Sequence, residues 1–267
     1  PAGGHGGGPS LRSSGARCDL IQHVAGQAFQ DLHRHGPQAS RCLLAQFDPT
    51  RPHDHASQVA GGVAAEADAG GNAVVLTSGQ NPQGVAADAT NVYWTNYYGT
   101  VMKMSILGGT PVQLASGQGW PLGIAVDATN VYWVDYSSTN GAVMKVAIAG
   151  GSPVPLATGQ ASPWGIALDA TNVYWTNSYG GTVMKVPLGG GTPVTIASGQ
   201  QGPVGIAVDA TNVYWTNNYA VMKVPIGGGT PVTVAANQGG PRGIDVDATA
   251  IYWANEVTQG TVMKVAK

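Results

Sequence analysis

Short apolar runs, rich in β-branched and aromatic residues, recur along the chain from about residue 72 onward. In the clearest repeat they cover residues 165–169, 172–177, 182–188 and 192–198, with Gly-, Asp- and Asn-rich turn segments between them. Each run is too short for an ordinary helix. Each is also nearly continuous in apolar residues, as in strands that are covered on both faces. The pattern predicts units of four short strands.

A nine-residue phrase marks the repeat. DATNVYWTN at residues 88–96 returns with small changes at residues 127–135, 169–177, 209–217 and 247–255. Successive tryptophans of its Tyr-Trp pairs are 39, 42, 40 and 38 residues apart. A period near 40 residues, with four strands in each unit, is typical of a β-propeller. We therefore predict an all-β protein, a β-propeller of five four-stranded blades formed by residues 72–267.

The ends of the repeat region predict how the ring closes. The fifth unit stops at residues 261–267 without an outer strand, whereas residues 70–80 align with an outer strand that has no blade before it. We expect residues 73–78 to pair beside residues 261–265, so that an N-terminal strand completes the last blade and leaves no free edge. The alternative is a six-bladed ring in which residues 30–70 form a degenerate blade.

The repeated phrase is similar to the YWTD repeat, the class B repeat of the LDL-receptor family, which bacterial relatives also carry. The motifs that carry the resemblance are P-x-G-I-A-V-D, a short turn and V-Y-W-T-N, and it covers residues 72–267. It implies a binding scaffold rather than a catalyst. Two features depart from the family: its terminal Asp is Asn in four units and remains only at Asp135, and its six blades contrast with the five legible here.

Residues 1–71 differ in composition from the repeats and are expected to form a partly flexible extension. They hold all six histidines and both cysteines, and they contain no Trp or Tyr. Helical spacing of apolar residues between Cys18 and His35, and again over residues 40–47, indicates a short helical hairpin that a Cys18–Cys42 disulfide could staple. The H-x-H pairs at His33/His35 and His53/His55 fix no third ligand, so they predict no metal site.

Composition narrows the classes of partner. Only 10% of residues are charged and the formal net charge is −2, which argues against nucleic acid as a partner, because nucleic acid requires a basic surface. No apolar stretch is long enough for a transmembrane helix, so we expect no membrane insertion. The chain starts at Pro1 without an apolar leader, as after leader removal or trimming. Low charge with many amide and hydroxyl side chains favours an extracellular, periplasmic or cell-surface location.

Residues that every unit repeats are expected to serve the blades. Asp88 and its equivalents end an inner strand and can bind the backbone of the next turn. The Tyr-Trp pairs are expected to wedge blade against blade, and the Lys of each M-K-V or M-K-M sequence to bury its stem and hydrogen-bond its ammonium group.

Ligand binding is expected where the units differ, in the loops that leave one end of the propeller. Those loops carry aromatic, amide and charged side chains that suit a sugar or a protein hot spot. The candidate ligand-binding residues are Trp120, Trp164, Arg242, Tyr97, Tyr98, Tyr136, Tyr179, Tyr219, Asp135 and Glu256. Alternatively, Trp120 and Trp164 plug the mouth of the ring.

The sequence favours a binding module for a glycan or a protein, with no cofactor and no resident metal. The repeats contain no His, no Cys and no nucleophile motif such as G-x-S-x-G. The alternative is a metal-dependent propeller hydrolase or lyase, resembling a lactonase or a streptogramin lyase, that would use carboxylates such as Asp135, Asp245 and Glu256. A calcium ion at Asp245 or Asp247 lacks the usual density of oxygen ligands. The sequence does not address oligomeric state.

Overall fold

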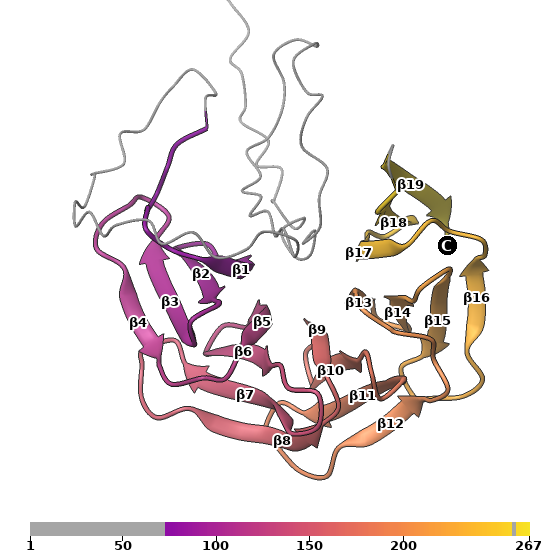
Figure 1. Ribbon diagram of the computed structural model, residues 1–267, viewed down its shortest axis with the longest axis horizontal. Helices are drawn as coiled ribbons and strands as arrows, with labels where there is room; N and C mark the ends of the chain where they lie inside the picture. Colours follow the sequence, from indigo (N-terminus) through magenta and orange to yellow (C-terminus); the bar gives the residue numbers. More distant parts are fainter. Residues whose placement is uncertain (1–72, 258–259) are drawn as a thin grey trace, which may run out of the picture.

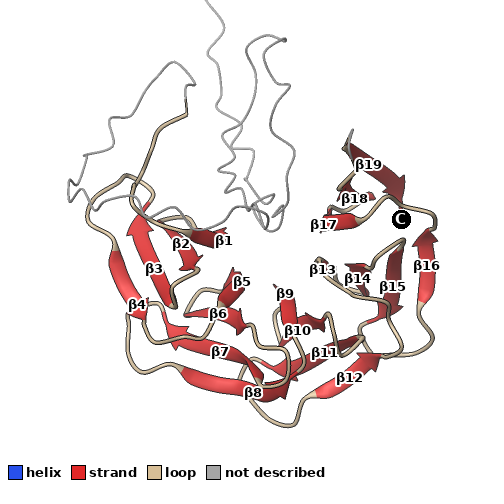
Figure 2. Ribbon diagram, in the orientation of Figure 1, coloured by secondary structure: helices blue, strands red, loops and turns tan. Residues whose placement is uncertain are grey.

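The computed structural model describes residues 73–257 and 260–267, which form antiparallel strands without any helix (Figures 1 and 2). The helical hairpin and the Cys18–Cys42 pairing predicted for the extension lie outside these residues. Within the described part of the chain, no helix long and apolar enough to cross a membrane is found. Five sheets follow one another around an arc, so the predicted five-bladed all-β propeller is confirmed.

The sheets are meanders whose strands run in sequence order from the centre of the arc to its rim. The first blade contains β1 (Pro82–Ala87), β2 (Asn91–Asn96), β3 (Thr100–Ser105) and β4 (Val112–Ala115). The second contains β5 (Pro121–Val126), β6 (Asn130–Asp135), β7 (Gly141–Ala147) and β8 (Val154–Gln160). The third contains β9 (Pro163–Leu168), β10 (Asn172–Asn177), β11 (Thr182–Pro187) and β12 (Val194–Ala197). The fourth contains β13 (Ile206–Val208), β14 (Asn212–Thr216), β15 (Val221–Pro225) and β16 (Val232–Ala235). The fifth contains β17 (Pro241–Val246), β18 (Ala250–Asn255) and β19 (Thr261–Ala266).

The repeated Asp holds the turn between the first two strands of each blade. In the third blade, Asp169 Oδ1 accepts hydrogen bonds from the backbone amides of Thr171 and Asn172, and its Oδ2 accepts one from the Tyr174 hydroxyl (2.6 Å). Burial alone would raise the pKa of Asp169, but these hydrogen bonds outweigh it and hold the pKa below 3.8. The same clamp recurs in all five blades, as expected for a residue that answers a local structural need.

Consecutive blades pack through two different surfaces. We call the side of a blade that is turned to the next blade in sequence its forward face, and the opposite side its rear face. The forward face presents the Tyr of the Tyr-Trp pair and the rear face presents the Trp. Between the second and third blades, Tyr132 and Leu156 meet Ile166 and Trp175, and both rings are fully buried. The predicted wedging role of the aromatic pairs is thus confirmed.

The backbones of neighbouring blades come close near the centre of the arc, and a glycine permits this. Gly84 donates its N–H to Thr95 Oγ1 (2.9 Å), and that hydroxyl donates to the carbonyl oxygen of Leu122 in the second blade (2.6 Å). A Cβ on Gly84 would lie only 2.5 Å from the same carbonyl oxygen. Thr176 and Thr216 make the equivalent bridges farther along the arc.

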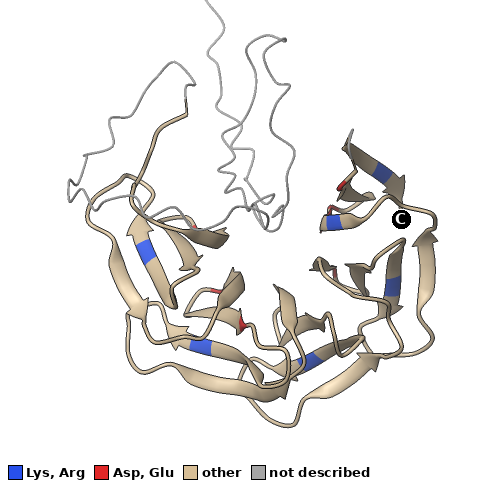
Figure 3. Ribbon diagram, in the orientation of Figure 1, with Lys and Arg blue, Asp and Glu red and all other residues tan. Residues whose placement is uncertain are grey.

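A lysine on the third strand ties each of the first three blades to its successor, and Figure 3 shows these basic positions repeating from sheet to sheet. The side chain crosses to a backbone carbonyl of the next blade, which satisfies the ammonium group while its stem lies along the sheet. The bonds are Lys103 to Ile148 (2.6 Å), Lys145 to Leu188 (2.8 Å) and Lys185 to Ile226 (2.7 Å).

The predicted closing strand is wrong for the described residues. Within residues 73–257 and 260–267, the fifth sheet has three strands, and β19 pairs with β18 alone. Residues 73–78 form no strand. Leu76 instead packs on the rear face of the first blade, against Val92, Trp94 and Met104. The outer-strand sequence thus keeps its contact with the following blade but gains no pairing partner. Among the described residues, no strand pairing joins the first sheet to the fifth, and β1 and β17 lie at the two ends of the arc (Figure 1). The alternative sixth blade falls mainly on residues outside the described part.

Candidate functional site

One end of the propeller carries two sets of loops, and backbone hydrogen bonds join them. The first set connects the outer strand of one blade to the inner strand of the next, and the second connects the second and third strands of each blade. Tyr136 N donates to Trp120 O (2.8 Å), and Gln200 N donates to Gly181 O (2.9 Å). The prediction that both sets leave the same end is therefore confirmed. We call this end the loop face.

Five aromatic rings cross the loop face over the first three blades, and we call them the aromatic ladder. Ring centroids are separated by 5.4 Å for Tyr98–Tyr97, 4.8 Å for Tyr97–Trp120, 5.2 Å for Trp120–Tyr136 and 6.0 Å for Tyr136–Trp164. All four pairs are edge-to-face, the geometry that aligns a ring's positive edge with its neighbour's negative face. Tyr98 is 74% exposed and the other four rings are half-buried. Five sequence candidates thus form one continuous surface.

Asp135 holds the central ring of the ladder in place. Its Oδ2 accepts the Gly119 N–H (2.9 Å) and its Oδ1 accepts the Trp120 N–H (2.7 Å). Hydrogen bonds to an ionised acceptor are stronger than neutral ones, so the carboxylate fixes the backbone from which Trp120 projects. Asp135 was predicted to contact ligand. Both carboxylate oxygens of Asp135 accept hydrogen bonds from this loop, so Asp135 has a positioning role. The sequence signal for this role is that the other four repeats have Asn at this position.

The equivalent Asn does a different task in other blades. In the third blade, Asn177 Nδ2 and Trp175 Nε1 both donate to Gln160 Oε1, each at 2.9 Å. Asp135 has no N–H to help hold the equivalent glutamine oxygen in the second blade. There, the fully buried Trp133 has no hydrogen-bond partner for Nε1 among the described residues. The second blade thus leaves the Trp133 indole N–H unsatisfied, at a cost of about 1–3 kcal/mol for such a group, while its Asp orders the ladder.

Four of the predicted candidates lie outside the ladder. Tyr179 (83% exposed) and Tyr219 (65% exposed) project from the third and fourth blades, and no ring pair joins them to the ladder among the described residues. Arg242 Nε pairs with Glu256 Oε2 at 2.6 Å on the fifth blade. Both of these side chains are exposed, so the pair contributes little to stability. The loop face therefore has an aromatic part and a charged part.

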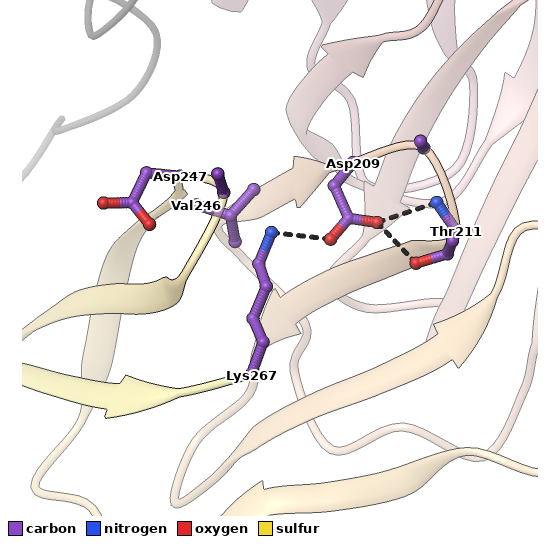
Figure 4. A pocket seen from close by; sticks show the side chains of 7 residues that line it. Asp209, Thr211, Val246, Asp247 and Lys267 are labelled. Carbon is purple, nitrogen blue, oxygen red and sulfur yellow. Dashed lines mark hydrogen bonds and ion pairs between the residues drawn. The ribbon is translucent and has the colours of Figure 1, made fainter.

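A hollow of about 600 Å³ lies at the opposite end of the propeller, between the Asp-Ala-Thr turns of the fourth and fifth blades. Lys267 reaches across it to Asp209 Oδ2 (2.6 Å), whereas the Asp247 carboxylate points away (Figure 4). Burial would raise the pKa of Asp209, but hydrogen bonds from Lys267, the turn amides and Tyr214 outweigh it and hold the pKa well below its ordinary value. Because its polar groups serve the turns and one ion pair, this hollow is not our candidate site.

Acidic residues are sparse over the propeller (Figure 3). Within residues 73–257 and 260–267, no group of three or more His, Cys, Asp and Glu side chains is arranged to hold a metal ion. The aromatic ladder is therefore the most developed site that the structure describes.

The fold and its ladder define a β-propeller with an aromatic loop face, and solved structures of the same fold exist. One is the nidogen/laminin complex (TM-score 0.61, 22% identity, covering 70% of this chain and 76% of that one). Another is virginiamycin B lyase from Staphylococcus aureus (0.56, 13%, 70% and 70%), and a third is a streptogramin B lyase (0.57, 14%, 70% and 68%). At these identities the likeness shows the fold alone. No protein-family model matches the sequence, and no curated protein matches it either.

Proposed function

We propose that this protein is a non-catalytic binding module that acts outside the cytoplasm and holds a glycan or a protein ligand on its loop face. The aromatic ladder carries the proposal. Its rings offer contact surface whose position is fixed by edge-to-face packing and by the Asp135 hydrogen bonds, so little side-chain freedom is lost on binding. Tryptophan and tyrosine dominate the energies of protein interfaces, and their faces also stack on sugar rings.

The repeats support a binding role for the ladder. The Tyr-Trp pairs that hold the blades together occur in every unit, whereas Trp120 and Trp164 each occur once. The nidogen/laminin complex shows that a protein of this fold can be part of a protein–protein complex. This neighbour supports the protein arm of the proposal, and the chemistry of the exposed rings supports both arms.

The test is a comparison of ligand capture by wild-type protein and by the double variant Trp120→Ala/Trp164→Ala. A glycan array and an affinity pull-down with mass spectrometry first identify the ligand. The double variant then weakens binding at least 30-fold, the effect of losing one strong hot spot (about 2 kcal/mol). Tyr179→Ala is the matched control, because it removes an exposed aromatic ring outside the ladder. A ligand that binds the double variant and wild-type protein equally well would refute the proposal.

The alternative, a metal-dependent hydrolase or lyase, rests on the lyases of the same fold. A catalytically inactive virginiamycin B lyase is named by a His-to-Ala substitution, whereas the repeats of this chain contain no His. Elemental analysis of the purified full chain separates the two functions. Stoichiometric divalent metal would favour the alternative.

A further inference from the structure

The forward face of the fifth blade is not covered by any described residue. Tyr252 is half-buried, whereas the equivalent Tyr of each other blade is at most 1% exposed. Val262 is 75% exposed, whereas its equivalents in the other blades are fully buried. Lys264 Nζ lies over the Tyr252 ring, 5.2 Å from its centroid, instead of reaching the carbonyl of a following blade. This face has the apolar character of a packed surface and lacks the surface that packs on it.

Asp245 makes this face different from the other four forward faces. It pairs across the sheet with Tyr252, a position that is Ala in every other blade and at most 6% exposed there. The pKa of Asp245 is raised to about 6, mainly by burial and also by the nearby Asp247, while the Val246 N–H and Lys267 act in the opposite direction. An ordinary rear face would set Ile and Trp against this carboxylate. We therefore expect the surface that covers it to supply a hydrogen-bond donor or a cation.

The fifth blade also differs from three of the other blades at the bridging threonine. The threonine that bridges to the next blade at Thr95, Thr176 and Thr216 is replaced by Ala254 in the fifth blade. Ala254 cannot donate a hydrogen bond to a following carbonyl. The second blade has Val134 at the same position and is covered by the third blade, so this change alone does not identify the covering surface.

The rear face of the first blade, at the other end of the arc, indicates which part of the chain could cover the fifth blade. Leu76 packs against the rear face of the first blade, and Gln80 Oε1 accepts hydrogen bonds from Trp94 and Asn96 as the last Gln of a preceding blade would. An apolar cavity of about 360 Å³ remains between residues 74–80 and this rear face. The chain that enters at residue 73 therefore already occupies the place of a preceding blade's outer strand.

We propose that residues 1–72 of the same chain cover the forward face of the fifth blade, and that one of their arginines pairs with Asp245. This segment is longer than any of the repeat steps, and it holds five of the six arginines in the chain. A second copy docking head to tail would need a free rear face, but residues 74–80 already occupy that of the first blade. Direct closure of the first blade onto the fifth would require pairing between residues 73–78 and β19, which the described residues do not show.

The test places a photo-crosslinking amino acid at Val262 of the full chain and maps the adducts by mass spectrometry. The expected adducts join position 262 to residues 1–72 within one chain, at monomer mass. Val194, on the outer strand β12 and 50% exposed, is the matched control and gives no such adduct. Position 264 is a second probe of the same face in case the first substitution disturbs folding, which circular dichroism monitors.

Three results at position 262 would overturn the proposal: adducts between two chains, adducts to the first blade, or no more adduct than at position 194. The arginine pairing is tested with Asp245→Arg in the crosslinking background. We expect it to lower the yield at position 262 at least fivefold, because two cations then face each other. Asp245→Asn should lower the yield less. An unchanged yield in Asp245→Arg would refute the ion pair.

Discussion

Replacing Gly84 by alanine tests how closely the first and second blades must approach. The added Cβ would lie 2.5 Å from Leu122 O, and ordinary van der Waals contact begins at 3.4 Å, so one backbone must move by about 0.9 Å. Overpacking of this kind costs about 1–3 kcal/mol. Displacing Leu122 O also weakens its hydrogen bond with Thr95, which contributes about 1 kcal/mol.

The substitution also restricts the unfolded chain, which returns about 0.4–1 kcal/mol. We therefore expect Gly84→Ala to lower the free energy of unfolding by about 2 kcal/mol. This corresponds to a fall in Tm of about 4–8 °C for a domain of this size. Urea unfolding followed by tryptophan fluorescence, together with calorimetry, measures both quantities.

Gly189→Ala is the matched control, because nothing lies within 4 Å of its added Cβ and its φ is not positive. It should leave stability within about 0.5 kcal/mol of wild type. If Gly84→Ala were as stable as this control, the close contact between the blades would not exist and the reasoning from it would fail.

Two further substitutions test the site and the turns. Asp135→Asn removes the carboxylate that accepts the Gly119 and Trp120 amides, so we expect a smaller near-ultraviolet dichroism signal and at least fivefold weaker ligand binding. Asp88→Asn is the control, because Asp88 lies outside the ladder. Unchanged binding by Asp135→Asn would refute the positioning role of Asp135. Asp169→Asn removes a carboxylate whose pKa lies below 3.8 in the folded protein, so its stabilisation is present above that value and is lost as the pH falls through the lower folded pKa. Denaturation should show a loss of about 1 kcal/mol at pH 7, a figure reduced for solvent exposure. The loss should shrink as the pH falls through the lowered folded pKa of Asp169, and a difference that stays constant over the acid range would contradict the linkage.

The five blades could be predicted from the sequence because each blade repeats the same residues at the same positions. The turn Asp, the Tyr-Trp pair and the bridging Lys recur at fixed positions, and their predicted roles match the observed contacts. The end of the arc could not be predicted in the same way. The sequence of residues 73–78 fits an outer strand, but alignment cannot show whether β19 lies within hydrogen-bonding reach.

The candidate site was predictable in part. Unrepeated aromatic residues indicated the loop face, and five of them meet there. Whether two rings touch depends on loop geometry that spacing does not encode, so Tyr179 could not be distinguished from Tyr136. The role of Asp135 depends on amides that approach it from the loop before Trp120.

The unlike forward and rear faces give the propeller a direction. A surface that fits only its opposite cannot join two copies by two-fold symmetry, because such a dimer requires a self-complementary patch. Head-to-tail joining could close only as a ring of copies or continue as a filament. Leu76 packs on the rear face of the first blade, and Asp245 lies on the forward face of the fifth, so both terminal faces of the arc differ from the faces that pack inside it. We therefore expect the features that end the repeat to disfavour head-to-tail association of copies through their blade faces.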